Sequence, residues 1–154
     1  MTASPKATSP RSPDPALSAL AQFRYQLRKF LRFSERAART AGITPLQHQL
    51  LLGVAGFTEH GFATLSELSE FLQERHNSVV ALVDRAVRAG LVRRHRNARD
   101  RRVVNVELTP RGRRVLSNLT RAHQRELDEF RWGEARHAPA SRAHSNRGPA
   151  RSRP

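Results

Sequence analysis

The stretch TLSELSEFLQERHNSVVALVDRAVRAG, residues 64–90, predicts two consecutive helices joined by a short break. Thr64 and Glu67 stand at capping-box spacing, in which the two side chains satisfy free backbone N–H groups at a helix start. The first helix therefore begins at Leu65, and the polar residues 73–76 interrupt it. The second covers residues 77–89 and stops at Gly90, because glycine readily adopts the left-handed conformation that closes a helix.

The second of these helices has one apolar face and one polar face. Apolar residues at helical spacing predict its buried side, formed by Val79, Leu82, Val83 and Ala86. Asparagine and arginine carry planar groups that match purine edges, and the N-terminal turn of such a helix usually enters the major groove. We therefore expect DNA contacts from the recognition-helix residues Arg75, His76, Asn77, Ser78, Ala81 and Arg85.

After Gly90 the hydrophobic pattern changes from helical to alternating, which predicts a hairpin of residues 91–96 and 102–108 with a polar tip between them. Nine arginines and two acids lie between residues 91 and 114. An arginine-rich hairpin beside a reading helix can enter the minor groove, whose negative potential attracts arginine. Asp100 is expected to orient an arginine there. The predicted wing contacts are Arg96, Arg99, Asp100, Arg101 and Arg102.

Helical patterns flank this core on both sides. Asp14-Pro15, Thr44-Pro45 and Thr109-Pro110 each pair a capping residue with proline at the first helical position, and predict helices from 15 to about 41, from 45 to about 57, and from 110 to 131. The domain is thus expected to span residues 15–132, between disordered segments 1–14 and 133–154. The expected fold class is α+β and mostly helical: a winged helix-turn-helix with a two-stranded β-wing and flanking dimerisation helices.

The composition favours a polyanionic partner. Lys and Arg number 28 against 13 acids, a formal net charge of +15. The chain has no cysteine, and none of its seven histidines lies three or four residues from another, so we expect neither a metal site nor a cofactor. No apolar run reaches the ~18–20 residues of a membrane span, which favours a cytoplasmic protein with no membrane partner.

These motifs, in this order, resemble the MarR (multiple antibiotic resistance regulator) family over about residues 17–130. The resemblance rests on Leu65-Ser66-Glu67-Leu68-Ser69-Glu70-Phe71-Leu72, Val83-Asp84-Arg85, Ala89-Gly90-Leu91-Val92, Asp100-Arg101-Arg102 and Leu108-Thr109-Pro110-Arg111-Gly112. It implies a homodimer that binds palindromic operators in duplex DNA, usually as a repressor and often released by a small aromatic effector. Residues 77–85 match the family's recognition helix, and residues 100–102 match its wing tip.

The C-terminal region departs from the family pattern. Members normally dimerise by intertwining the first helix with a long C-terminal helix pair, whereas residues 133–154 are rich in Arg and Pro and contain no Leu, Ile or Val. Two alternatives follow. Either the dimer rests on residues 15–40 and 110–131, or dimerisation is weakened.

Two other function classes fit the charge less well. A basic RNA-binding or ribosome-associated protein would have aromatic residues among its cations for base stacking, and the hairpin has none. A winged-helix scaffold for protein partners would suit a neutral or acidic second helix, which Arg75, Arg85 and Arg88 oppose. We expect no enzyme, because no nucleophile stands with a matching base and orienting group.

Overall fold

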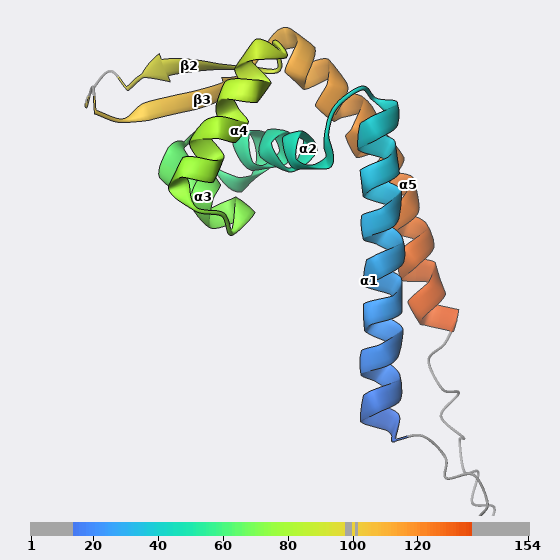
Figure 1. Ribbon diagram of the computed structural model, residues 1–154. Helices are drawn as coiled ribbons and strands as arrows, with labels where there is room; N and C mark the ends of the chain where they lie inside the picture. The colour runs from blue at the N-terminus through green and yellow to red at the C-terminus, as the bar shows by residue number, and fades with distance from the viewer. Residues whose placement is uncertain (1–13, 98–99, 101, 137–154) are drawn as a thin grey trace, which may run out of the picture.

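The computed structural model describes residues 14–97, 100 and 102–136, with side chains as far as residue 128. A small head of helices and a sheet sits at one end of two long helices that form a stalk (Figure 1). The elements in chain order are α1 (Pro15–Thr40), α2 (Pro45–Leu52), the π-helical turn η1 (Gly53–Phe57), β1 (Phe62–Thr64), α3 (Leu65–Leu72), α4 (His76–Arg88), β2 (Val92–Arg96), β3 (Val104–Leu108) and α5 (Pro110–Arg136).

The helix starts predicted at Pro15, Pro45 and Leu65 are confirmed in atomic detail. The Asp14 carboxylate accepts from the Ala16 backbone N–H at 2.8 Å, with Pro15 at the first helical position. Both capping boxes form: Thr44 exchanges hydrogen bonds with Gln47, and Thr64 with Glu67. Because these signals are local, each helix begins where its own few residues dictate.

The sheet has one strand more than the sequence predicts. Its order is β1-β3-β2 and both pairings are antiparallel, so β3 is central. The wing itself is the expected two-stranded hairpin of β2 and β3. The strand β1 was not predicted because its three residues are too short to show an alternating pattern. It forms because Ala63 pairs with Val106 on β3 and is fully buried.

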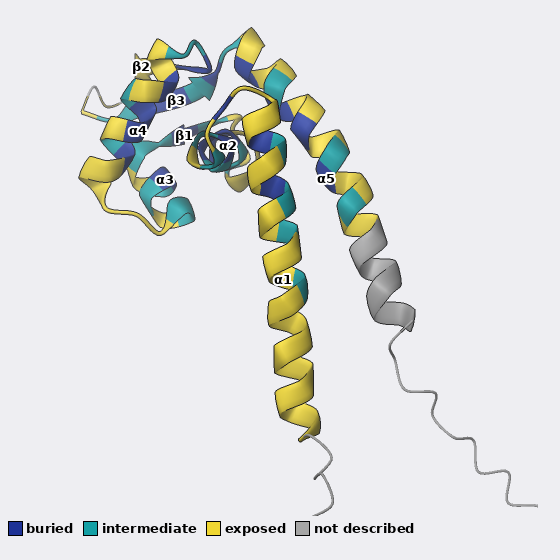
Figure 2. Ribbon diagram, turned by 45° about the vertical axis from the view of Figure 1, so that its right-hand side comes forward, coloured by how far each residue is buried: buried dark blue, intermediate teal, exposed yellow. Residues whose placement is uncertain are grey.

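The core lies inside the head. The residues predicted to face inward from α4, Val79, Leu82, Val83 and Ala86, are all buried there, together with leucines of α2 and α3 and with valines of the sheet. In the stalk, by contrast, α1 is exposed along most of its length (Figure 2). Only its last turns, around Ser34 and Ala38, are buried against the head.

The last helix is longer than predicted. It continues to Arg136, so the expected start of a disordered tail at residue 133 is wrong for residues 133–136. Glu134, Ala135 and Arg136 have high helix propensity and extend a helix that is already nucleated. The remainder of the predicted tail, 137–154, and the predicted lead-in 1–13 lie outside the described residues. Within the described part of the chain, no helix is both long and apolar enough to span a bilayer.

Candidate nucleic-acid interface

The helix α4 presents its N-terminal turn to solvent. Arg75 is the N-cap residue, and α4 begins at His76, one residue before the predicted start. Its inward face fills the core, so the polar side is left in water. All six residues predicted for the recognition helix are exposed: Arg75, His76, Asn77, Ser78, Ala81 and Arg85.

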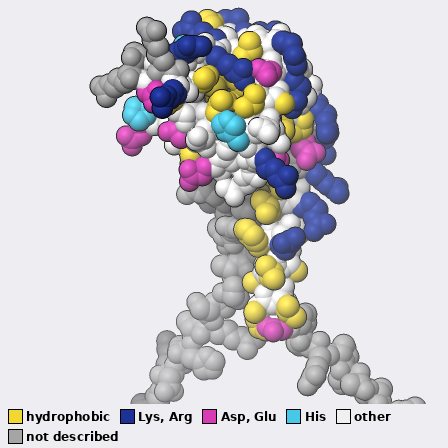
Figure 3. Space-filling view, turned by 60° about the vertical axis from the view of Figure 1, so that its left-hand side comes forward, with side chains coloured by type: hydrophobic (Ala, Val, Ile, Leu, Met, Phe, Trp, Pro, Cys, Tyr) yellow, Lys and Arg dark blue, Asp and Glu magenta, His cyan; other side chains and the backbone are white. Residues whose placement is uncertain are grey.

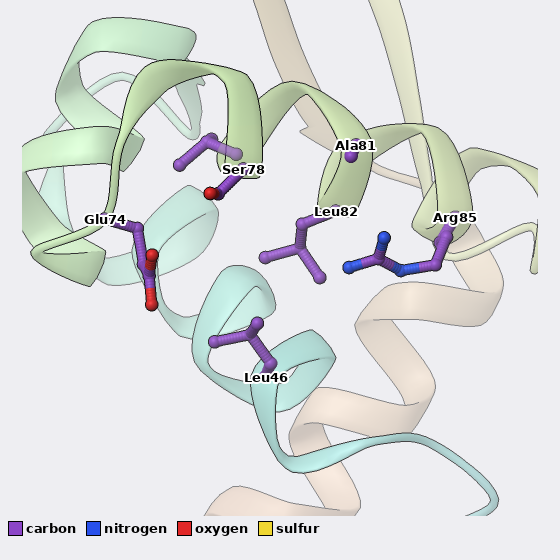
Figure 4. Close-up of a pocket in the computed structure, with 7 residues that line it drawn as sticks. Leu46, Glu74, Ser78, Ala81, Leu82 and Arg85 are labelled. Carbon is purple, nitrogen blue, oxygen red and sulfur yellow. The ribbon is translucent and has the colours of Figure 1, made fainter.

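A hollow of about 380 Å³ separates α4 from the start of α2 (Figure 4). Ala81 and Ser78 line it from α4, and Leu46 lines it from α2. Figure 4 shows the guanidinium of Arg85 lying over this hollow, on the same side of α4 as Leu82. Arg85 is therefore exposed as predicted, but it extends along the side of α4 that faces α2.

The wing hairpin lies beside α4 and extends beyond it (Figure 1). Its strands pair in register from Val92 opposite Leu108 to Arg96 opposite Val104. Arg96, Asp100 and Arg102 are exposed at or near its tip. The other two predicted wing residues, Arg99 and Arg101, lie outside the described residues.

The Asp100 carboxylate binds the backbone of the turn at the tip of the wing. Its Oδ1 accepts a hydrogen bond from the backbone N–H of Arg102 at 2.9 Å, and the backbone N–H of Val103 donates to the Asp100 carbonyl at 3.0 Å. This carboxylate thus shapes the turn, and its expected role in orienting an arginine side chain stays a prediction, because Arg99 and Arg101 lie outside the described residues. Aspartate commonly shapes turns in this way, because its short side chain reaches an amide two residues on.

An ion pair missed by the sequence analysis joins the wing to the recognition helix. Nη1 of Arg94 lies 2.6 Å from Oδ1 of Asp84, and Nη2 donates to the Val80 carbonyl at 3.1 Å. Arg94 in β2 thus holds two successive turns of α4. Asp84 and Arg94 are ten residues apart in the sequence, so no local pattern predicts their contact.

A second acid removes part of the wing's positive charge. Glu107 in β3 accepts from Nε of Arg93, its cross-strand neighbour, and its carboxylate also lies 3.5 Å from Nδ1 of His95. Arg93 is therefore paired inside the hairpin. Arg96 and Arg102, nearer the tip, form no ion pair with any described residue.

The start of α5 fixes the end of α4. The Thr109 hydroxyl donates to the Gly90 carbonyl at 2.6 Å, and Nη1 of Arg111 donates to the Ala89 carbonyl at 2.8 Å. Gly112 packs so closely on Leu91 that a Cβ there would lie 2.0 Å from the Leu91 carbonyl oxygen. The recognition helix and the wing are thus anchored to the same helix, α5.

Basic side chains gather on part of the face of the head that Figure 3 shows. Figure 3 shows Lys and Arg side chains along the top and one side of the head, and continuing down one edge of the stalk. Among the described residues there is no group of three or more His, Cys, Asp or Glu that could hold a metal ion. The arrangement is suited to binding a polyanion by charge and by shape.

Two buried histidines lie where α2, α5 and α1 meet. The rings of His48 and His123 are 4.8 Å apart, and Phe30 and Phe33 of α1 stack edge-on against His123. Burial, and secondarily the neighbouring His123, lower the pKa of His48 from 6.5 to about 4. His48 is thus packed in the core, and its lowered pKa keeps it neutral near pH 7.

A helix-turn-helix whose second helix is flanked by a basic β-hairpin defines a winged helix-turn-helix domain. Residues 41–103 match the model of the MarR family. The chain is 34% identical over 71 residues to the HTH-type transcriptional repressor MdtR of Bacillus subtilis. The matched region covers 46% of this chain and 44% of the relative. It is 33% identical over 88 residues to the uncharacterised regulator YsmB of the same organism, which covers 57% of this chain and 58% of the relative.

The fold comparison agrees. A solved MarR family protein from Bacillus stearothermophilus superposes with a TM-score of 0.64 at 27% identity, over 78% of this chain and 82% of that one. Residues 41–103 are thus similar in sequence to the MarR family, and most of the chain is similar in fold to a solved member of it. The chain spans about half the length of the curated relatives that it matches.

Proposed function

We propose that this chain is a transcription regulator that binds duplex DNA in a sequence-specific way. One observation carries the proposal: α4 presents Asn77, Ser78 and Ala81 to solvent, and Arg94 fixes the basic wing directly beside it. A polar helix with a small residue at its centre can approach base edges closely, while wing arginines contact the backbone or the minor groove. Arg75, His76, Arg85, Arg96 and Arg102 are the further contacts proposed, with Arg99 and Arg101 from the part of the wing outside the described residues.

The proposed assembly is a homodimer through α1 and α5. Large apolar side chains of α1 remain exposed in the single chain, including Leu17 at 64%, Leu20 at 56% and Phe23 at 57%. Leu127 of α5 is also exposed. A contiguous apolar surface of this kind marks a protein interface. Figure 3 shows hydrophobic side chains along the stalk, where a second copy would cover them.

A two-fold dimer would place two recognition helices on one duplex, and the operator is therefore proposed to be palindromic. The name of the relative MdtR supports a repressor rather than an activator. A repressor of this kind would act in the cytoplasm by occupying its operator. The small aromatic effector implied by the family resemblance remains a prediction.

A binding titration distinguishes a DNA-binding protein from the alternative, a basic RNA-binding protein. Fluorescence anisotropy with matched DNA and RNA duplexes, at about 150 mM salt, should show tighter binding to DNA. Equal or tighter binding to RNA would contradict the proposal. Sedimentation of the same samples should show a dimer, and a variant with Leu20→Ser, Phe23→Ser and Leu27→Ser should be monomeric and bind a palindromic site more weakly.

A further inference from the structure

One face of α1 carries a row of cations that the proposed DNA-binding surface does not use. We call this row the α1 ridge. The whole of α1 contains a single acid, Glu35, which pairs with Arg39 at 3.9 Å. All six members of the ridge are exposed: Arg24, Arg28, Lys29, Arg32, Arg36 and Arg39.

The ridge has almost no partners within the chain. Apart from Arg39, none of its members forms an ion pair or a hydrogen bond with any described residue. Arg28, Arg32 and Arg36 follow one another at four-residue spacing. Like charges at that spacing destabilise a helix by a few tenths of a kcal/mol per pair, roughly. Repulsion within the ridge therefore lowers the stability of α1, unless a bound anion neutralises these charges.

The ridge faces away from the rest of the protein. At 100° per residue, Arg28, Arg32 and Arg36 lie on the side of α1 opposite Phe23 and Leu27. Phe30 and Phe33, which meet α5, lie to one side of Phe23, and the exposed Leu20 and Leu27 lie to its other side. A dimer formed through Leu20, Phe23 and Leu27 leaves Arg28, Arg32 and Arg36 in solvent, whereas Arg24 borders that contact. The stalk also projects away from α4 and the wing in Figures 1 and 2.

Part of the ridge forms a shaped surface. Ala21, Tyr25, Arg28, Lys29 and Arg32 line a hollow of about 350 Å³. Nζ of Lys29 lies 6.0 Å from the centre of the exposed Tyr25 ring. Three cations thus surround one hollow, an arrangement that fits the oxygens of a phosphate group.

We propose that the α1 ridge binds the phosphate backbone of a second DNA duplex, so that a regulator seated on its operator bridges two segments of DNA. From Arg24 to Arg39 the ridge is ~22 Å long at 1.5 Å per residue. One strand of duplex DNA presents about six phosphates over that length, and Arg28, Arg32 and Arg36 share the side of α1 that would face them. The inference rests on the proposed function, because the head must hold the first duplex.

DNA is the polyanion that the observations favour. Once the head is bound, neighbouring DNA is held at high effective concentration close to the ridge. Single-stranded RNA would call for several stacking aromatics, and Tyr25 is the one aromatic side chain among the residues that line the hollow. An anionic membrane would need the apolar side of α1, which α5 and the second copy occupy.

A two-duplex capture experiment with the full chain tests this. A duplex carrying a site enriched from a random DNA pool is immobilised and saturated with protein, and capture of a labelled second duplex is measured across a range of salt concentrations. The test variant combines Arg28→Gln, Arg32→Gln and Arg36→Gln. The matched control combines Arg114→Gln, Arg121→Gln and Arg125→Gln, which removes the same charge from exposed positions of α5. A third variant replaces the same three ridge arginines with lysine.

The ridge variant should bind the first duplex like the wild type but capture at least about tenfold less of the second, with a salt slope shallower by about 3. The lysine variant and the α5 control should capture normally. Equal losses in the ridge variant and the α5 control, or normal capture by the ridge variant, would overturn the proposal. So would stronger competition by duplex RNA or by anionic vesicles than by DNA. Failure of the wild type to hold the first duplex would overturn the proposed function itself.

Discussion

The guanidinium of Arg94 lies 2.6 Å from the carboxylate of Asp84, and this pair fixes the wing to the recognition helix. The same arginine donates to the Val80 carbonyl at 3.1 Å, so β2 is joined to both the backbone and a side chain of α4. The two parts proposed to contact DNA are therefore joined by side-chain contacts. The spacing between helix and wing is set by a contact that itself need not touch DNA.

Replacing Asp84 with alanine should weaken DNA binding, although it removes a negative charge. Loss of the pair frees the wing from α4, and we expect a penalty of about 1 kcal/mol, or roughly fivefold in Kd, because the pair is partly exposed. Arg94→Ala should do the same, and the double variant should add little. The exposed Glu59→Ala is the control, for which simple electrostatics predicts slightly tighter binding. If Asp84→Ala also binds more tightly, the pair does not position the wing.

Arg102→Ala should weaken binding to all DNA sequences alike, because a wing arginine contacts phosphates or the minor groove rather than one base pattern. The plot of log K against log salt should become shallower by about 1. The effect should grow when Arg101→Ala is added. Arg125→Ala removes one exposed charge from α5 and serves as the control. An unchanged slope for Arg102→Ala would remove this residue from the interface.

Gly112→Ala should destabilise the fold. The new Cβ would lie 2.0 Å from the backbone oxygen of Leu91, and backbone cannot yield as a side chain can. We expect the free energy of unfolding to fall by about 3 kcal/mol in urea titrations followed by circular dichroism. Gly56→Ala is the matched control, since its Cβ would meet nothing within 4 Å. Equal stability of the two variants would show that α5 and Leu91 are not in close contact.

Acid should destabilise the protein through His48. Its pKa is lowered to about 4 in the fold, first by burial and then by His123, so the unfolded chain binds the proton more readily. The stability contributed by neutral His48 is complete above pH 6.5 and is lost as the pH falls toward 4. The loss over that window should be about 3 kcal/mol. His48→Leu should flatten this dependence and the exposed His60→Leu should not; identical profiles for the two variants would contradict the assignment.

The sequence predicts those parts of the fold whose signals are local. The capping residues Thr44 and Thr64 and the glycine at 90 lie within a few residues of the turns they form, and all appear where expected. The strand β1 could not be predicted, because Ala63 becomes a strand residue only by pairing with Val106, 43 positions later. A three-residue strand has no periodicity of its own.

In the candidate site, too, local patterns were predicted from the sequence and contacts between elements were not. The apolar periodicity of α4 predicted which residues face outward, and Asn77, Ser78 and Ala81 are exposed as expected. Contacts between elements were hidden: Arg93 and Arg94 counted as free cations in the sequence, whereas Glu107 and Asp84 neutralise them in the fold. Charge counts along a chain therefore overestimate the cations available to DNA.

We propose that α4 selects a DNA sequence for a two-fold dimer. Selection of bound sites from a random duplex pool, at about 150 mM salt, tests it most directly, with the wild type and Asn77→Ala compared in parallel. For the wild type we predict an inverted repeat with half-sites about one helical turn apart. For Asn77→Ala we predict the same repeat with a weaker base preference at one position in each half-site. A pool without an enriched repeat, from a protein whose binding disappears as salt rises, would contradict the account.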